Sequence, residues 1–324
     1  MAKTVRFYGA GGPEVLKLED VEVGKPRSGE TRIRHTAIGV NFIDTYHRSG
    51  LYPLSLPSGL GSEGAGIVEA IGTGVTHIQP GDRVAYAGGP PGSYGDVRVM
   101  PADRLVKLPD AISDQQAAAM MLKGMTVQYL IRRTYCVQRG DTVLWHAAAG
   151  GVGTIACQWL KALGATVIGT VGSEAKAKIA RAHGCDHTIL YKDEDFVERV
   201  RELTAGQRLP VVYDSVGKST FPGSLDCLRL RGLFVSFGNA SGPVPSFELG
   251  TLMTKGSLFV TRPTLASYTS TRAELEATAK DLFDIVLSGH VKIEVKHVYP
   301  LQDVQQVHRD LEARKTTGSV VMVP

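Results

Sequence analysis

Three small residues, Ala148, Gly150 and Gly153, have the spacing A-x-G-x-x-G. They follow a short apolar run at 143–145 and precede apolar residues at helical spacing in 155–163. A strand, a glycine-rich turn and a helix in this order are typical of dinucleotide binding, because amide groups at a helix N-terminus attract a pyrophosphate. The alternative is a tight turn that binds no ligand.

Each residue of this turn has an expected task. A side chain at Gly150 or Gly151 would hold the backbone away from a pyrophosphate, and one at Gly153 would push the helix off the sheet. Ala148 and Val152 complete the predicted phosphate-binding turn. Gly164 stands where a helix C-cap belongs, and 165–170 reads as the second strand of a βαβ unit.

The end of that second strand indicates which dinucleotide binds. An NAD site places Asp or Glu there for the ribose 2′-hydroxyl, and this strand end carries no acid. Gly172 and Ser173 leave room for a 2′-phosphate, and Lys176 can reach it from the next helix, so we expect NADP(H), bound as NADPH. Glu174 argues against this choice, although an acid in the first helical turn also suits the helix dipole. The alternative for Lys176 is a solvated helix lysine.

Further cofactor contacts are expected where later strands end, because ligands lie outside the carboxyl ends of parallel strands. Tyr191 is expected to stack on adenine or contact the 2′-phosphate, and Gly238 to let the backbone approach the nicotinamide ribose. The alternative for each is an ordinary loop residue. The residues at these strand ends are Tyr191, Ser215, Phe237, Gly238 and Asn239.

Strand and helix alternate throughout the region that follows the turn. This pattern predicts a parallel sheet with helices on both faces, an α/β doubly wound arrangement. Helices are expected to start at Ser173 and Asp193 and to end near 183 and 206. The sixth strand is a candidate pairing edge, which favours a homodimer. The expected strands are 143–145, 165–170, 187–191, 211–215, 233–237 and 257–261.

The first 110 residues read as β-rich, with glycine-containing turns between short strands, which suggests a compact barrel-like domain. Two helical segments, 117–122 and 127–131, are expected to be separated by Lys123-Gly124. Thr271-x-x-Glu274 forms a capping box that opens a helix to about 288. Residues 293–324 read as strand, helix and strand (319–323), and this tail is expected to pack back on the first domain. The expected N-terminal strands are 5–7, 16–21, 30–40, 66–71, 82–87 and 95–99.

Composition limits the remaining possibilities. At 324 residues the chain can form two domains with real cores, and its net charge of +4 includes no block of Lys and Arg. Four widely spaced cysteines without a C-x-x-C pair indicate reduced, mostly buried thiols. The sequence shows no signal-peptide pattern and no apolar run long enough for a bilayer, so a cytoplasmic protein without a membrane partner is expected.

These residues carry a resemblance to a known family. The chain resembles the zinc-free quinone oxidoreductases of the medium-chain dehydrogenase/reductase superfamily, including the ζ-crystallin group. The resemblance implies a GroES-like β-rich catalytic domain (1–123 and 266–324) and a Rossmann domain that binds NADPH (124–265). It also implies an active-site cleft between the domains and often a homodimer. The matching stretches are NFIDTYHRSGLY, LPSGLGSEGAGIV, GDRVAY, LKGMT, HAAAGGVG, VYDSVG and SFGNASG.

Zinc-dependent relatives differ from this chain at three positions. They carry a metal-ligand cysteine where this chain has Asn41, a histidine where it has Ser62, and another cysteine near Lys123. No cysteine precedes Cys136, so the four-cysteine structural lobe is absent as well. Because zinc needs converging sulfur or nitrogen ligands, we expect no metal.

Without a metal, the nicotinamide carries the chemistry and the protein orients it and stabilises the oxygen that gains charge. Asn41 is expected to contact a nicotinamide or substrate carbonyl, and Tyr46 and Tyr52 to offer ring faces and phenol donors. Arg262 is expected to bind a phosphate or a quinone oxygen, and Thr126 resembles a residue that lines the nicotinamide pocket. The alternatives are a turn residue for Asn41, packing for the tyrosines and Thr126, and a surface arginine for Arg262.

Two further expectations complete the candidate site. Glu63 is interpreted as structural, a carboxylate that orients its neighbours. Thr317 is assigned to the cofactor site by resemblance alone, as a residue that closes the cleft.

The resulting hypothesis is a metal-independent NADPH:quinone oxidoreductase that passes electrons or hydride from nicotinamide C4 to a quinone. An NADPH-dependent enone or 2-alkenal reductase of the same build is the first alternative. A non-enzymatic role, as RNA-binding or crystallin-like protein, is the second. The moderate charge without a basic stripe argues against nucleic acid as a partner.

Overall fold

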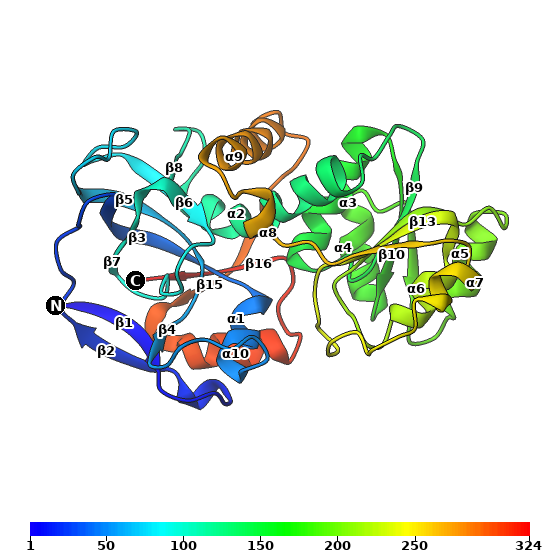
Figure 1. The fold of residues 1–324 in the computed structure, drawn as a ribbon, viewed down its shortest axis with the longest axis horizontal. Helices are drawn as coiled ribbons and strands as arrows, with labels where there is room; N and C mark the ends of the chain where they lie inside the picture. Colours follow the sequence, from blue (N-terminus) through cyan, green and yellow to red (C-terminus); the bar gives the residue numbers. More distant parts are fainter. The chain divides into compact units, whose positions relative to one another are not determined.

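The computed structural model describes all 324 residues, which divide into two compact units. Unit 1 consists of Met1–Met125, Thr269–Leu287 and Ile293–Pro324. Unit 2 consists of Thr126–Tyr268 and Ser288–Lys292. The two have different architectures, β-rich in unit 1 and α/β in unit 2 (Figure 1).

Unit 2 is built on a six-stranded sheet in the order β11-β10-β9-β12-β13-β14, and all neighbouring strands are parallel. The order runs outward in both directions from β9 and β12, so the connections reverse at this point of the sheet. Such a switch point is where α/β proteins bind ligands. The strands are β9 (Thr142–Trp145), β10 (Thr166–Val171), β11 (His187–Leu190), β12 (Leu209–Asp214), β13 (Leu228–Ser236) and β14 (Phe259–Thr261).

Helices cover both faces of this sheet, as the βα alternation predicts (Figure 1). α3 contacts α4 on one face, and α5 contacts α6 on the other. The central strand β12 is buried at every residue, which explains why it reads as a continuous apolar run. The helices of unit 2 are α3 (Gly151–Leu163), α4 (Glu174–Ala182), α5 (Phe196–Leu203), α6 (Phe221–Asp226), α7 (Gly250–Thr254) and α8 (Leu265–Tyr268).

Unit 1 holds a seven-stranded sheet in the order β15-β16-β3-β5-β6-β8, with β7 paired to β3, and a three-stranded sheet, β2-β1-β4. The C-terminal strand β16 pairs antiparallel with β3, so the tail returns to the N-terminal domain as predicted. The strands are β1 (Ala2–Phe7), β2 (Lys17–Val21), β3 (Glu30–Val40), β4 (Ser58–Gly59), β5 (Glu63–Ile71), β6 (Arg83–Ala87), β7 (Val97–Pro101), β8 (Val106–Lys107), β15 (Val295–Pro300) and β16 (Ser319–Val323).

The helices of unit 1 include α1 (Phe42–Ser49), α9 (Arg272–Leu287) and α10 (Val304–Glu312). The capping box predicted for α9 forms, because Thr271 Oγ accepts from Glu274 N and the Glu274 carboxylate accepts from Thr271 N, each at 3.2 Å. The core of this unit joins strands from both ends of the chain, with Val5, Ile38 and Val320 in one buried cluster.

The predicted break at Lys123-Gly124 is wrong. A single helix, α2 (Asp114–Tyr129), runs through both residues and continues into a π-helical turn at Leu130–Thr134. Gly124 serves packing instead: a Cβ placed there would lie 2.4 Å from Leu282 Cδ1 of α9. The glycine therefore marks a close approach of two helices rather than a helix end.

Among the other boundaries that differ from the prediction, two have a clear local cause. α5 begins at Phe196 rather than at Asp193, because the Asp195 carboxylate accepts from the amides of Val197 and Glu198 and caps the helix. The sixth strand, β14, begins at Phe259 rather than at Ser257, whose φ of 56° is incompatible with a strand.

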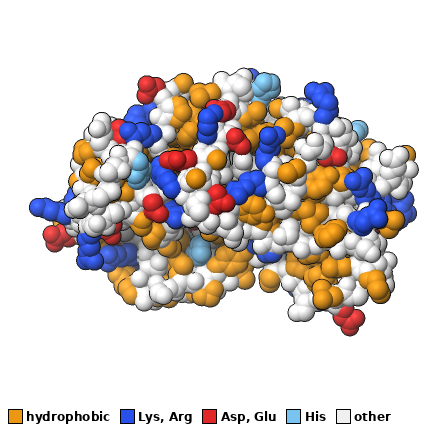
Figure 2. Space-filling view, turned by 45° about the horizontal axis from the view of Figure 1, so that its top comes forward, with side chains coloured by type: hydrophobic (Ala, Val, Ile, Leu, Met, Phe, Trp, Pro, Cys, Tyr) orange, Lys and Arg blue, Asp and Glu red, His pale blue; other side chains and the backbone are white.

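Two surface properties bear on function. No helix of the structure is both long and apolar enough to cross a membrane. On the face drawn in Figure 2, Lys and Arg side chains are interspersed with Asp and Glu rather than gathered into one basic stripe.

Candidate functional site

The phosphate-binding turn predicted from sequence connects β9 to α3. Gly150 is the N-cap of α3, and its amide donates to Ala147 O at 2.9 Å. The amides of Gly151, Val152 and Gly153 occupy the first helical turn and have no acceptor within the helix. They form the kind of N-terminal amide group that binds anions.

Gly150 and Gly153 differ in how strongly the surrounding structure requires a glycine at each position. A Cβ at Gly153 would lie 2.5 Å from Ala147 O and 2.6 Å from Ala148 O, so the close packing of α3 against the turn requires glycine. A Cβ at Gly150 would meet only Ala147 O, at 3.2 Å. The fold itself therefore requires glycine strongly at position 153 and only weakly at position 150.

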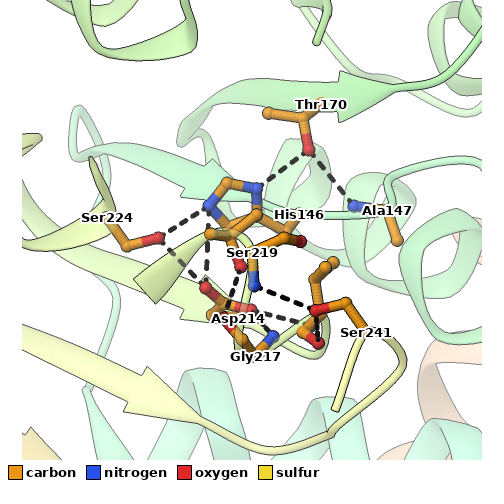
Figure 3. A network of polar contacts seen from close by, with 10 residues as sticks. His146, Ala147, Thr170, Asp214, Gly217, Ser219, Ser224 and Ser241 are labelled. Atoms are coloured by element: carbon orange, nitrogen blue, oxygen red, sulfur yellow. Dashed lines mark hydrogen bonds and ion pairs between the residues drawn. The ribbon is translucent and has the colours of Figure 1, made fainter. Parts of the chain in front are cut away.

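A buried polar network lies directly behind the turn (Figure 3). His146 Nδ1 is 2.9 Å from Thr170 Oγ, and His146 Nε2 is 3.0 Å from Ser224 Oγ. Ser224 donates to Asp214 Oδ2 at 3.0 Å, and Asp214 Oδ1 accepts from the amides of Val216 and Gly217 at 2.7 and 2.9 Å. Burial lowers the pKa of His146, against the opposing effect of the Asp214 charge.

This network was not predicted from the sequence. The side chains come from the residue directly after β9 and from β10, β12 and α6, so no local motif joins them. The only signal was a polar residue, His146, directly after an apolar strand.

Ser173, Lys176 and Tyr191 lie after the next two strands, as predicted. Ser173 is the N-cap of α4, and its hydroxyl accepts from Lys176 N at 3.4 Å. The Tyr191 phenol lies over Gly172, where a Cβ would be 2.7 Å from the hydroxyl oxygen. The space beside Gly172 is thus bounded by an aromatic ring with a hydrogen-bonding group.

Glu174, the residue that argued against a 2′-phosphate, is engaged elsewhere. Its carboxylate forms an ion pair with Arg181, about two turns along α4. Both side chains are about half exposed, so this is a surface ion pair that gives the acid a partner within its own helix.

The loops after β12 and β13 contact each other. Ala240 N donates to Ser215 O at 3.1 Å, and a Cβ at Gly238 would lie 2.6 Å from the same oxygen. Gly238 is therefore required by the packing of these two loops. The Phe237 ring lies against Trp145 with a centroid distance of 5.4 Å.

Arg262 and Thr126 complete the predicted residues of unit 2. Arg262 follows β14 and donates to Ser236 O at the end of β13, at 3.1 Å. It is an exposed arginine held at the carboxyl edge of the sheet. Thr126 is half-buried in α2 and does not follow a strand. The structure thus brings the predicted cofactor residues of unit 2 other than Thr126 to one edge.

In unit 1, Asn41 lies in a buried polar cluster with Glu63 and Lys123. Asn41 Nδ2 donates to Glu63 Oε2 at 2.6 Å, and Lys123 Nζ lies 3.5 Å from the same oxygen. The other Glu63 oxygen accepts from Leu122 N at 2.7 Å. Burial raises the pKa of Glu63, and the Lys123 ammonium is the largest opposing influence. Glu63 orients its neighbours as expected, whereas the role of Lys123 was missed.

Tyr46 and Tyr52 form part of an aromatic group at α1. Their ring centroids are 5.1 Å apart in an edge-to-face arrangement, and Tyr46 also contacts Phe42. Tyr46 is buried and Tyr52 half-buried. Thr317, assigned by resemblance, is in the segment before β16, where its amide donates to His297 Nε2 at 3.2 Å.

The polar cluster around Asn41 does not offer a set of metal ligands. Asn41, Glu63 and Lys123 place an amide, one carboxylate and an ammonium together, and the ammonium opposes a cation. No group of three or more His, Cys, Asp or Glu side chains in the structure is arranged to hold a metal ion.

Comparison with known proteins identifies the family. Residues 27–110 match the model of the alcohol dehydrogenase GroES-like domain, and residues 151–282 match that of the zinc-binding dehydrogenases. The chain is 56% identical over 325 residues to a quinone oxidoreductase of Pseudomonas aeruginosa, with all of both chains covered. The chain belongs to the quinone oxidoreductase family. This family is part of the medium-chain dehydrogenase/reductase superfamily, so the resemblance and the fold class predicted from sequence are confirmed.

Two further relatives of this quinone oxidoreductase family member are informative. The crystal structure of Escherichia coli quinone oxidoreductase complexed with NADPH matches with a TM-score of 0.98 at 52% identity, covering 99% of this chain and 100% of the other. A 2-haloacrylate reductase of a Burkholderia species is 47% identical over 331 residues, covering 100% of this chain and 99% of the relative.

Proposed function

We propose that this protein is an NADPH-dependent quinone reductase. The observation that carries the proposal is the full-length match, with a TM-score of 0.98, to a quinone oxidoreductase crystallised with NADPH. The free amides at the start of α3 and the neighbouring strand ends supply a matching cradle in this chain. NADPH is the expected cofactor and a small-molecule quinone the expected substrate.

The cofactor residues have distinct proposed roles. The amides of Gly151, Val152 and Gly153 hold the pyrophosphate, and Ser173 and Lys176 bind the 2′-phosphate. A second group lies at other strand ends and contacts adenine, ribose and nicotinamide. That group is Tyr191, Ser215, Phe237, Gly238 and Asn239.

Bound NADPH supplies a hydride or electrons from nicotinamide C4, and the protein orients it. We assign Asn41, Tyr46, Tyr52 and Arg262 to hydrogen bonding with the nicotinamide or with the oxygen that gains charge. Because a quinone is a good acceptor, the reaction needs no Lewis acid. The roles of Thr126 and Thr317 in the cofactor site are proposed on resemblance.

Steady-state assays test this function. We expect NADPH oxidation with a benzoquinone or a naphthoquinone, a lower kcat/KM with NADH, and full activity after dialysis against a chelator. Absence of quinone-dependent NADPH oxidation would overturn the proposed activity. Loss of activity that zinc restores would overturn metal independence alone.

A second candidate function is reduction of an activated alkene. It is favoured by the 47% identity to a 2-haloacrylate reductase, whose name describes an α,β-unsaturated acid as substrate. The same hydride donor serves both reactions, so the assay compares kcat/KM for a quinone with that for a 2-alkenal and a 2-haloacrylate. A higher kcat/KM for an alkene than for the quinone would identify the alkene as the preferred substrate.

We also propose a homodimer that forms through the edge strand β14. Exposed apolar side chains surround this edge, with Phe259 60% exposed, Leu230 70% and Met253 70%. An edge strand flanked by such side chains is a typical pairing surface. A cytoplasmic location remains a prediction, and the crystallin-like or RNA-binding alternative gains no support from the charge distribution in Figure 2.

A further inference from the structure

Figure 3 shows the contacts of the network behind the turn, and the chemistry of its groups fixes the direction of each hydrogen bond. Ser224 donates its only hydroxyl proton to Asp214, because a carboxylate is an acceptor. Ser224 Oγ must then accept from His146 Nε2, which fixes the proton of the imidazole on Nε2. Since burial keeps His146 neutral, its Nδ1 accepts a hydrogen bond from the Thr170 hydroxyl.

The chain ends at the backbone of the turn. Thr170 Oγ, having donated its proton, accepts from Ala147 N at 3.4 Å. Thr170 also accepts from Ala148 N through its carbonyl oxygen, at 3.1 Å. One residue of β10 therefore engages two successive amides of the turn.

Ala147 needs such support. Its φ is 57°, in the left-handed region, where a residue with a Cβ is disfavoured. Its carbonyl accepts from Gly150 N, so the conformation of Ala147 decides where the following amides point. A shift at Ala147 would be transmitted directly to the start of α3.

The same carboxylate supports the loop on the other side of the switch point. Asp214 Oδ1 accepts from Val216 and Gly217, and Ser241 N donates to Val216 O at 2.8 Å. All four side chains of the network are at most 1% exposed. The network therefore connects the phosphate turn to the loops that follow β12 and β13.

We propose that Thr170 is a positioning residue for dinucleotide binding. Its hydroxyl, directed by the His146–Ser224–Asp214 chain, holds Ala147 in the left-handed conformation and presets the phosphate-binding turn. This inference rests on the proposed NADPH-dependent function and assigns no direct contact between Thr170 and the cofactor.

The test compares Thr170→Val, which removes the hydroxyl at constant shape, with Thr170→Ser, which keeps it. We expect Thr170→Val to weaken NADPH binding by about 5-fold, the effect of one ordinary hydrogen bond, and to raise KM for NADPH more than it lowers kcat. Thr170→Ser should restore most of the affinity. Binding is measured by fluorescence titration.

A fragment separates positioning from general damage. Adenosine 2′-monophosphate lacks the pyrophosphate, so its inhibition constant against NADPH should stay unchanged in Thr170→Val. Equal losses for NADPH and the fragment, or no loss of NADPH affinity, would overturn the proposal. If wild type itself binds no NADPH, the proposed function fails, and this inference fails with it.

A second variant is available if Thr170→Val does not fold. Ser224→Ala removes the hydrogen bonds of Ser224 with His146 and Asp214, at a distance from the turn. It leaves in place the two hydrogen bonds that Asp214 accepts from the amides of Val216 and Gly217. It should weaken NADPH binding by roughly 2-fold, again without changing the fragment. Unchanged NADPH affinity in a folded Ser224→Ala protein would count against the proposal.

Discussion

Lys176 lies half-buried on the first turn of α4, three residues after the Ser173 cap. We predict that Lys176→Ala weakens NADPH binding about 10-fold, because hydrogen bonds to charged groups contribute roughly 1.5–3 kcal/mol. NADH binding should change little, since NADH has no 2′-phosphate. Lys178→Ala, exposed on the same helix, is the matched control. Equal losses for both dinucleotides in a titration would refute the role of Lys176.

His35 predicts a pH dependence of stability in unit 1. Burial lowers its pKa from 6.5 to about 4. Its Nδ1 donates to Gly95 O at 2.6 Å, and its Nε2 accepts from the Tyr86 hydroxyl at 2.9 Å, so the fold holds it neutral. The unfolded chain binds a proton below pH 6.5 and the folded chain only below about 4. The contribution of neutral His35 to stability is therefore complete above pH 6.5 and is lost as the pH falls to about 4.

We expect this loss to be on the order of 1–3 kcal/mol in the free energy of unfolding. The measurement is urea unfolding at about pH 7 and about pH 4.5, with wild type compared with His35→Gln. Two other buried groups also change stability with pH: His308, whose pKa is lowered to about 3, acts in the same direction as His35, and Asp44, whose pKa is raised to about 7, acts in the opposite direction. Both groups are present in wild type and in His35→Gln, so the difference between the two proteins isolates His35. Parallel pH profiles for the two proteins would show that His35 does not contribute.

The sequence predicted the position of a site residue where that position depends only on neighbouring residues. Ser173 and Lys176 follow a strand and start a helix, so their position could be read from neighbouring residues. His146 could not be understood in this way, because Thr170 and Ser224 are 24 and 78 residues away along the chain. The ion pair of Lys123 could not be predicted either, because its partner Glu63 lies 60 positions earlier on another element.

At the scale of elements, the βα alternation predicted the parallel sheet, because apolar strands and amphipathic helices differ in period. The capping box at Thr271 likewise placed the start of α9 correctly. Gly124 misled the prediction since glycine is read as a helix breaker, whereas here it admits Leu282 from a helix more than 150 residues later. Tertiary packing of this kind leaves no local pattern.

The turn before α3 predicts different outcomes for its two glycines. Gly150→Val should fold, because φ is −78° and the only near neighbour of its Cβ is Ala147 O at 3.2 Å, but the side chain should abolish dinucleotide binding. Gly153→Val should reduce stability itself, by about 2 kcal/mol or more, since its Cβ meets backbone at 2.5 Å. Thermal unfolding and NADPH titration distinguish the two. Tight NADPH binding by Gly150→Val would mean that the turn does not contact the cofactor.

At the scale of the whole molecule, two of the edge strands, β14 and β15, are compared as surfaces for pairing between copies of the chain. β14 ends the sheet of unit 2 and β15 ends the larger sheet of unit 1. Apolar side chains are exposed at both, with Phe259 60% exposed on β14 and Val298 46% on β15. Near β14, two further apolar side chains are exposed. Leu230 belongs to the neighbouring strand β13, and Met253 to α7, the helix directly before β14.

We therefore predict that Phe259→Lys separates the proposed homodimer into monomers, because a charge at an edge strand opposes pairing. Val298→Lys introduces the same charge at the other edge and should leave the dimer intact. Sedimentation velocity over a range of concentrations measures both variants beside wild type. A dimer that survives Phe259→Lys but dissociates in Val298→Lys would move the interface to β15, and a wild-type monomer at every concentration would remove it. Because Phe259 lies outside the proposed cofactor residues, NADPH titration of the monomeric variant also shows whether each copy binds its cofactor alone.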